Sequence, residues 1–208
     1  MWSPEPEAIR ELRSLINRPN AIEKDIQREK NRLEKSKISQ ASVLAITSIE
    51  RMLDSLSLEK KCLEDLIKQH IDQDPKLKRN KALLETIPGV GEVIARHMCL
   101  IIGSRTFKSA SQCAAFLGLI PLQHESGSSV KERPRLSKAG DATVRAKLYM
   151  AAVVSIRHNP DIKRQYERLL KNGKSKLSAI GAAMRKLVHI CFGVLKHQTP
   201  YQVQTLKN

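Results

Sequence analysis

The chain has 208 residues, and its 37 Lys and Arg against 21 Asp and Glu give a formal net charge of +16. Such an excess favours a polyanionic partner, and nucleic acid is the first candidate. Aromatic residues make up only 3% of the chain, which argues against base-stacking platforms and predicts contacts with phosphates. The sequence has no run of 18 apolar residues and residues 1–7 do not resemble a signal peptide, so we expect a cytoplasmic, nucleoid-associated protein with no membrane partner.

Residues 1–75 are predicted to form a long helical hairpin or coiled coil. In the first helix, expected from about Ala8, positions three and four residues apart form a seam: Leu12, Leu15, Pro19, Ile22, Ile26, Glu29 and Leu33. Pro19 is expected to kink or split this helix. After a polar turn at residues 36–42, a second and more regular seam contains Ile46, Ile49, Leu53, Leu56, Lys60, Leu63, Ile67 and His70. The pattern allows a coiled coil that joins copies of the chain into a homo-oligomer, or a hairpin whose two arms pack on each other.

A second domain is predicted over residues 76–208, because Asp74-Pro75 interrupts the helical pattern. Expected helices over residues 77–87 and 92–102 flank a short turn, which predicts a helix-hairpin-helix at about residues 80–103. Glycines let a backbone approach a phosphate closely, and the following helix offers unpaired amides. Gly89, Val90 and Gly91 are therefore candidate nucleic-acid contacts, and the alternative is a plain tight turn between packed helices.

Residues 121–140 form a predicted loop, the serine loop, which contains four serines, two glycines and two prolines. Loops of this length are usually functional or disordered. Basic residues of the loop and of the next helix form a second candidate phosphate contact: Lys131, Arg133, Arg135, Lys138, Arg145 and Lys147. The alternative is a solvated charged loop that binds nothing.

The rest of the second domain is predicted to be helical. Ser109 and Gln112 indicate a capping box for a helix that ends at Leu117. Asp141 is the expected cap of a helix that buries Val144, Leu148, Ala151 and Ser155. A charged helix over residues 161–170 ends at Gly173, and a last helix to about Lys196 has the apolar stripe Leu177, Ile180, Met184, Leu187, Cys191 and Leu195. We find no alternating strand pattern, so the expected fold class is all-α, a long helical hairpin followed by a compact helical domain.

The four cysteines predict free thiols and no metal site. They are scattered, without a C-x-x-C pair, and each falls in an apolar helical pattern typical of a buried thiol: Cys62, Cys99, Cys113 and Cys191. We therefore expect no disulfide framework, no zinc site and no cofactor in this chain.

Several motifs of the second domain follow one another in an order that resembles a known family. They are Leu84–Gly91, Ala115–Leu119 with Pro121, Ser126-Gly127, Leu136–Asp141 with Arg145, and Ala182–Leu187 with Pro200-Tyr201. From about Leu77 to Tyr201 the chain resembles the pilin-invertase-like insertion-sequence transposases, which are guided by a bridging RNA. The family combines an RNase H-like domain that has an acidic, metal-binding tetrad, a coiled coil, and a carboxy-terminal domain with a nucleophilic serine.

The resemblance implies that the chain corresponds to the last two of these parts, as a natural fragment or an expressed piece. It implies DNA and a structured guide RNA as partners, and Mg²⁺ in an acidic domain that these residues do not contain. The family's serine precedes a glycine in this loop, which maps it onto Ser126, with Ser128 and Ser129 as the other candidates. Glu125 stands where many relatives have a further serine. We interpret His124 as a bystander or a phosphate contact rather than a general base.

Two functions remain open from the sequence. The chain is part of a DNA recombinase in which Ser126 forms a phosphoserine intermediate, or it is a non-enzymatic helical DNA-binding or scaffold protein whose serine loop is a flexible clamp. A membrane-surface adaptor is a distant third. Under the first reading we expect the isolated chain to bind DNA without cleaving it, because the metal and its carboxylates lie elsewhere.

Overall fold

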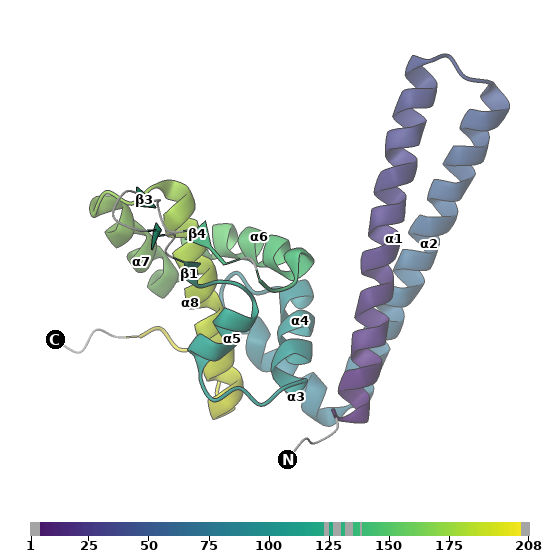
Figure 1. Ribbon diagram of the computed structural model, residues 1–208. Coiled ribbons are helices and arrows are strands. Elements are labelled where there is room, and N and C mark those ends of the chain that lie inside the picture. Colours follow the sequence, from purple (N-terminus) through teal and green to yellow (C-terminus); the bar gives the residue numbers. More distant parts are fainter. Residues whose placement is uncertain (1–4, 123–124, 127–129, 132–134, 138, 205–208) are drawn as a thin grey trace. The chain divides into compact units, whose positions relative to one another are not determined.

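The computed structural model describes residues 5–122, 125–126, 130–131, 135–137 and 139–204, and it confirms the all-α fold class. Eight helices account for most of these residues, and the strands among them are two residues long (Figure 1). The chain divides into two compact units, Met1–Pro75 and Lys76–Asn208. We call the first the hairpin unit and the second the helical unit.

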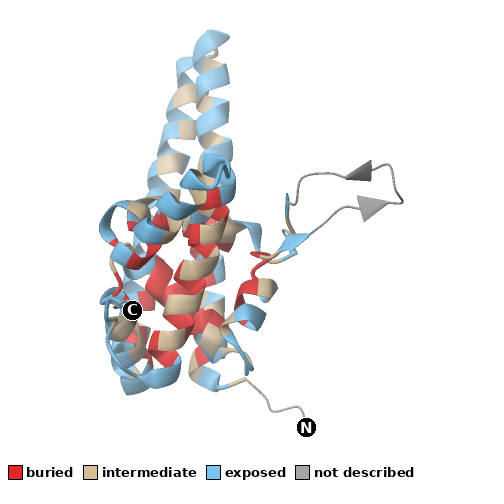
Figure 2. Cartoon of the chain, turned by 90° about the vertical axis from the view of Figure 1, so that its left-hand side faces the viewer, coloured by how far each residue is buried: buried red, intermediate tan, exposed pale blue. Residues whose placement is uncertain are grey.

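The hairpin unit consists of α1 (Glu7–Ile38) and α2 (Val43–Gln73), which pack side by side. Every position of the two predicted seams is buried or half-buried, whereas most other positions are exposed. The seams therefore face each other within one chain. The fully buried side chains gather where α1 begins and α2 ends, and the outer half of the hairpin has only half-buried and exposed residues (Figure 2).

The structure corrects two expectations for the hairpin unit. Helix α1 runs through Pro19 without interruption, so of the two expected effects of the proline, a kink or a split, the split does not occur. Proline removes one backbone donor, and the buried seam on both sides of Pro19 is enough to keep the 32-residue helix continuous. Cys62 is exposed rather than buried, because it lies on the face of α2 that points away from α1.

The helical unit is built around α8 (Lys176–His197), which packs against α5 (Ala110–Phe116), α6 (Ala142–His158) and α7 (Pro160–Lys171). Most of the predicted stripe of α8 is buried, but Leu177 is 70% exposed because it lies in the first turn of the helix. Among the described residues, α8 alone is long and apolar enough to cross a membrane, and half of its apolar stretch is buried inside the unit, as in a core helix.

The ends of these helices follow local side-chain chemistry. The Asp141 carboxylate accepts a hydrogen bond from the Thr143 amide at 2.7 Å, as predicted for the cap of α6. At α5, the Ser109 hydroxyl accepts from the Gln112 amide at 3.2 Å. The Gln112 side chain accepts in return from the Lys108 amide, one residue before the position that a standard capping box uses.

The serine loop contains short strands that the sequence did not predict. β1 (Pro121–Leu122) pairs antiparallel with β4 (Arg135–Leu136), and β2 (Glu125–Ser126) pairs antiparallel with β3 (Val130–Lys131). Each strand has two residues, which is too short for the apolar alternation that identifies a strand in a sequence. Two strand pairs thus lie within the segment between α5 and α6.

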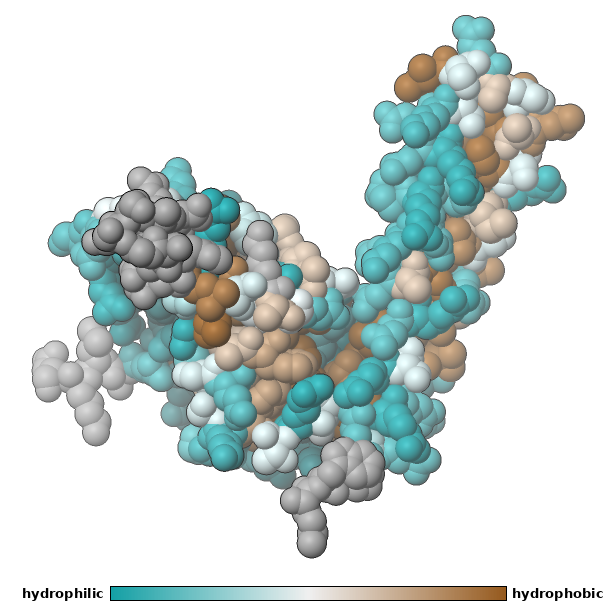
Figure 3. Space-filling view, viewed as in Figure 1, coloured by the Kyte–Doolittle hydropathy of each residue, from teal (hydrophilic) through white to brown (hydrophobic). Residues whose placement is uncertain are grey.

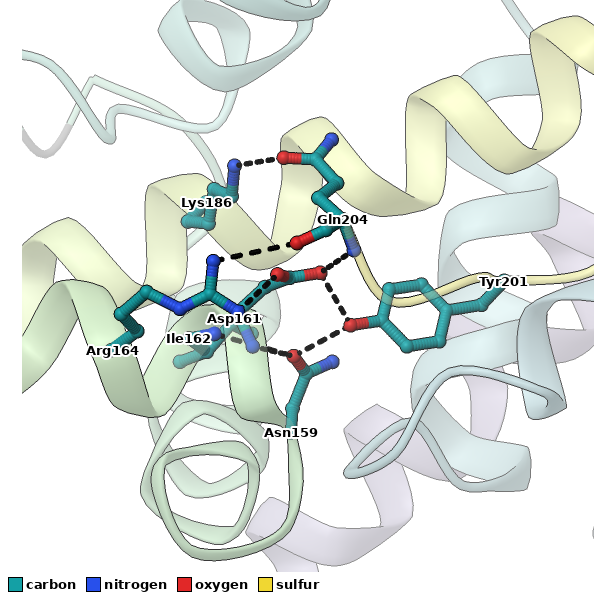
Figure 4. Close-up of polar contacts among 7 residues, drawn as sticks. All are labelled: Asn159, Asp161, Ile162, Arg164, Lys186, Tyr201 and Gln204. Carbon is teal, nitrogen blue, oxygen red and sulfur yellow. Dashed lines mark hydrogen bonds and ion pairs between the residues drawn. The ribbon is translucent and has the colours of Figure 1, made fainter. Parts of the chain in front are cut away.

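Residues 198–204 form a strap across the helical unit (Figure 4). The Tyr201 hydroxyl lies 2.7 Å from Asp161 Oδ2 and 3.0 Å from Asn159 Oδ1, and the Gln204 amide donates to Asp161 Oδ2 at 3.0 Å. Burial, followed by the hydrogen bond and negative charge of Asp161, raises the pKa of Tyr201, so this hydroxyl stays a donor. The Tyr201 amide donates to the Thr86 side chain at 2.9 Å, and the strap therefore connects the start of α7 with the segment after α3.

Candidate nucleic-acid interface

The positive charge of the chain is concentrated in the helical unit. Residues 1–75 contain 13 Lys and Arg against 14 Asp and Glu, whereas residues 76–208 contain 24 against 7. The hairpin unit is thus close to neutral, and the helical unit has an excess of 17 positive charges. A polyanion is therefore attracted to the helical unit and gains little from the hairpin unit.

The predicted helix-hairpin-helix turn joins α3 (Pro75–Glu85) to α4 (Glu92–Gly103) and packs on α6. Gly89 has a φ of +95°, and a Cβ built on it would lie 2.0 Å from Ser155 Oγ. The Ser155 hydroxyl donates to the Pro88 carbonyl at 3.2 Å, and Ser155 is completely buried. Only glycine therefore fits at position 89, because α6 lies so close to it. The sequence did not reveal this reason.

The other two residues of this turn differ in accessibility. Val90 is 5% exposed, and its amide donates to the Ile87 carbonyl at 2.9 Å. Gly91 is exposed, and no atom lies within 4 Å of the position that a Cβ would take there. Of the three residues predicted to contact phosphate, Gly91 is the one with an open face.

The base of the serine loop is anchored in the helical unit. A Cβ on Gly140 would lie 2.4 Å from the Phe116 carbonyl oxygen, so only glycine allows the loop to return this close to the end of α5. The Arg145 guanidinium donates to the Gly140 carbonyl. Leu136 of β4 lies 3.4 Å from the Cβ position of Gly181 in α8. The two ends of the loop are thereby held next to α5, α6 and α8.

The predicted loop residues are only partly within the described structure. Ser126 lies in β2, where its backbone pairs with Val130, and Lys131 lies in β3 opposite Glu125. Arg135 is exposed in β4, and Arg145 is half-buried in the first turn of α6. The remaining predicted loop residues lie outside the described residues: His124, Ser128, Ser129, Arg133 and Lys138.

The two predicted phosphate contacts lie at opposite ends of α6. Arg145 is in its first turn at the base of the serine loop, whereas Ser155, which contacts Gly89, is near its last turn. Ten residues of helix separate the two by roughly 15 Å. Helix α6 therefore spaces the turn and the loop apart and does not bring them to one point.

Two buried basic side chains of α4 were not identified from the sequence, because they fall within an apolar helical pattern. Arg96 is 8% exposed and His97 is 2% exposed. The His97 Nδ1 atom lies 2.6 Å from the Val93 carbonyl oxygen. Burial lowers the pKa of His97 to about 4, the Val93 hydrogen bond opposes this, and the charges of Lys147 and Arg96 lower the pKa further.

This burial predicts a loss of stability in mild acid. The unfolded chain protonates His97 near pH 6.5 while the folded chain keeps it neutral, so the free energy of unfolding should fall as the pH drops from about 6.5 to about 4, by up to about 3 kcal/mol. Urea unfolding across this range measures the effect. His97→Leu should flatten the curve, and the exposed His158→Gln should not; equal slopes in the parent and His97→Leu would contradict the prediction.

Within the described residues, the structure has no group of three or more His, Cys, Asp or Glu side chains that is able to hold a metal ion. The three cysteines of the helical unit, Cys99, Cys113 and Cys191, are buried and free. Burial raises the pKa of the Cys99 and Cys113 thiols to about 12, so both stay neutral at physiological pH. They are core side chains rather than nucleophiles or ligands.

Comparison with known proteins identifies the family. Residues 81–167, which include the turn and the serine loop, match the profile of the Transposase IS116/IS110/IS902 family. The chain is 30% identical over 203 residues to the pilin gene-inverting proteins of Moraxella lacunata and Moraxella bovis; the match covers 97% of this chain and 62% of each relative.

A third relative is the "insertion element IS110 uncharacterized 43.6 kDa protein" of Streptomyces coelicolor, which is 24% identical over 162 residues; the match covers 76% of this chain and 38% of that protein. The chain thus spans less than two thirds of the length of these relatives. These sequence matches support assignment of the chain to the IS116/IS110/IS902 family of transposases.

Proposed function

We propose that the chain is the DNA-binding part of an insertion-sequence transposase and contributes a serine nucleophile to DNA strand exchange. The observation that carries the proposal is the concentration of positive charge. All of the excess lies in the helical unit, which also contains the matched residues 81–167. Charge of this sign and density holds a phosphodiester backbone without reading its sequence. A pilin gene-inverting relative supports recombination as the process.

In the proposed reaction the Ser126 hydroxyl oxygen attacks a backbone phosphorus. A serine–phosphorus ester bond forms, the bond from phosphorus to one deoxyribose oxygen breaks, and that oxygen leaves with a proton as a sugar hydroxyl. One phosphoester bond replaces another, so the intermediate can be rejoined to a second strand without an energy source. The cationic side chains Arg133, Arg135, Lys138 and Arg145 neutralise the phosphate charge during the attack.

The proposal includes three partners beyond these residues. An acidic domain outside these residues would hold Mg²⁺, which would supply positive charge at the phosphate, and a structured guide RNA would select the DNA target. The hairpin unit joins copies of the chain into a homo-oligomer. Support for the oligomer comes from α2, where several large apolar side chains remain 48–82% exposed: Leu44, Met52, Leu58 and Leu66. Exposed apolar side chains on one helix are typical of a surface that another chain covers.

Binding to duplex DNA tests the proposed function directly. The 208-residue chain should bind duplexes with an affinity that falls steeply with salt, which fluorescence anisotropy measures as the slope of log affinity against log salt concentration. A loop variant with Lys131, Arg133 and Arg135 changed to Gln should lose about 0.9 of slope for each phosphate contact removed. A hairpin control with Lys30, Lys61 and Lys68 changed to Gln should keep the parent slope.

The alternatives predict other results. A chain that does not bind duplex DNA even at low salt would overturn the proposal. If the loop variant and the hairpin control have the same slope of log affinity against log salt concentration, the serine loop is not part of the interface. If the chain is a non-enzymatic scaffold, it would still bind DNA, but the complete protein that contains it would never form a covalent adduct with DNA.

A further inference from the structure

The exposed surface of α7 and of the turn into α8 is strongly basic and has no assigned role. The exposed positions of α7 include four basic residues and one acidic residue, Lys163, Arg164, Arg168, Lys171 and Glu167. Lys174 and Lys176 continue the positive charge through the turn after Gly173. These six basic residues define the α7–α8 surface, most of which lies beyond the matched residues 81–167.

The charges of this surface have few partners within the protein. Arg164 lies 3.5 Å from Asp161, and no ion pair is recorded for the other five basic residues among the residues that the structure describes. In the hairpin unit, by contrast, six Lys or Arg form ion pairs with Glu or Asp at 2.5–3.9 Å: Arg10, Arg13, Arg28, Arg32, Lys37 and Lys60. The protein thus balances charge in one unit and leaves it unbalanced on the α7–α8 surface.

The positions of Lys174 and Lys176 do not serve helix stability. Arg168 and Lys171 suit the negative end of the α7 dipole, but Lys174 and Lys176 lie at the positive end of α8, whose first turn has no acidic residue. Positive charges at a helix start are unfavourable by some tenths of a kcal/mol each. A bound polyanion would remove this repulsion, whereas solvent alone only screens it.

The α7–α8 surface adjoins the serine loop. The first turns of α8 lie beside β1 and β4 (Figure 1), where Gly181 of α8 contacts Leu136 of β4. Arg135 is exposed in the same strand. Figure 3 shows hydrophilic residues at the left-hand edge of the helical unit, where α7 lies. The base of the serine loop thus contacts α8, the helix that follows the α7–α8 surface in the chain.

We propose that the α7–α8 surface binds the phosphodiester backbone of the nucleic acid that flanks the strand held at the serine loop. From Lys163 to Lys171 the helix extends roughly 12 Å, the length of three to four base pairs. The inference rests on the proposed function, because it assigns a second contact to the same nucleic acid interface. The chemistry recognised is the backbone phosphate, which duplex DNA and folded RNA share.

The test compares three proteins of 208 residues: the parent, a variant with Lys171, Lys174 and Lys176 changed to Gln, and the hairpin control with Lys30, Lys61 and Lys68 changed to Gln. All six lysines are exposed, so each change removes charge without removing core packing. One arm measures binding to duplex DNA and the other binding to a folded RNA hairpin, each over a series of salt concentrations. The α7–α8 variant should lose at least tenfold in affinity at low salt, and its slope should decrease by about 0.9 for each of up to three lost contacts.

Loss of slope in the DNA arm, the RNA arm or both supports the inference and identifies the source of the phosphates. If the parent binds and the α7–α8 variant matches the hairpin control in both arms, this inference is overturned while the proposed function stands. If the parent binds neither DNA nor RNA, both are overturned.

Discussion

Replacement of Ser126 by alanine should abolish recombination and leave DNA binding intact. The change removes one hydroxyl and no charge, so affinity for duplex DNA should stay within about twofold. Loss of a nucleophile lowers the rate of enzymatic reactions by about three orders of magnitude or more. Recombination by the complete transposase in cells, and the SDS-resistant protein–DNA adduct that the complete transposase forms on a nicked substrate in vitro, provide two independent measurements.

Neighbouring serines are the matched controls for this experiment. Ser128→Ala and Ser129→Ala make the same chemical change within three residues of Ser126 and should retain both recombination and the adduct. If recombination persists in Ser126→Ala and is lost in one of the controls, the nucleophile has been assigned to the wrong hydroxyl. If all three variants recombine normally, the serine mechanism is refuted.

Gly89→Ala should destabilise the helical unit severely. An alanine Cβ would lie 2.0 Å from Ser155 Oγ and 2.8 Å from Ser155 Cα, which are closer than any normal contact. The φ of +95° adds strain for any residue with a side chain. Because α6 must move to accept the methyl group, we expect a loss of about 3 kcal/mol or more in the free energy of unfolding. Urea or thermal unfolding followed by circular dichroism measures it.

Gly91→Ala, two residues away, is the control that separates folding from binding. Nothing lies within 4 Å of its Cβ position, and its φ of −96° suits any residue. Its stability should change by less than about 1 kcal/mol. If Gly91 lies against a phosphate, this stable variant should bind DNA more weakly than the parent. A destabilisation of Gly91→Ala equal to that of Gly89→Ala would contradict the packing argument.

Helix positions were largely predictable from the sequence because their causes are local. The seams of α1 and α2 follow from the spacing of apolar residues, and the start of α6 follows from the Asp141 cap. Gly173, with a φ of +76°, ends α7 as predicted because glycine adopts that conformation without strain. The paired strands of the serine loop were missed, since pairs of two residues leave no periodic signal in a sequence.

The candidate site was predictable as a set of residue types and not as an arrangement. The family resemblance selects Ser126, and the basic residues of the loop indicate phosphate contact. Nothing local in the sequence indicates that Gly89 contacts Ser155, 66 residues later in the chain, or that Gly181 lies against the base of the loop. The basic residues of the α7–α8 surface can be counted in the sequence, whereas the distance of this surface from the loop depends on how α8 packs.

The sequence by itself determined the helical class and the basic character of the chain, because apolar periodicity and charge act over a few residues. The tertiary structure alone decided which face of each helix is buried against which neighbour. It assigned Gly89 to packing, left Gly91 open, and brought β4 and α8 together. These contacts join residues that are far apart in the chain, and their selection depends on close packing of the whole core rather than on any local preference.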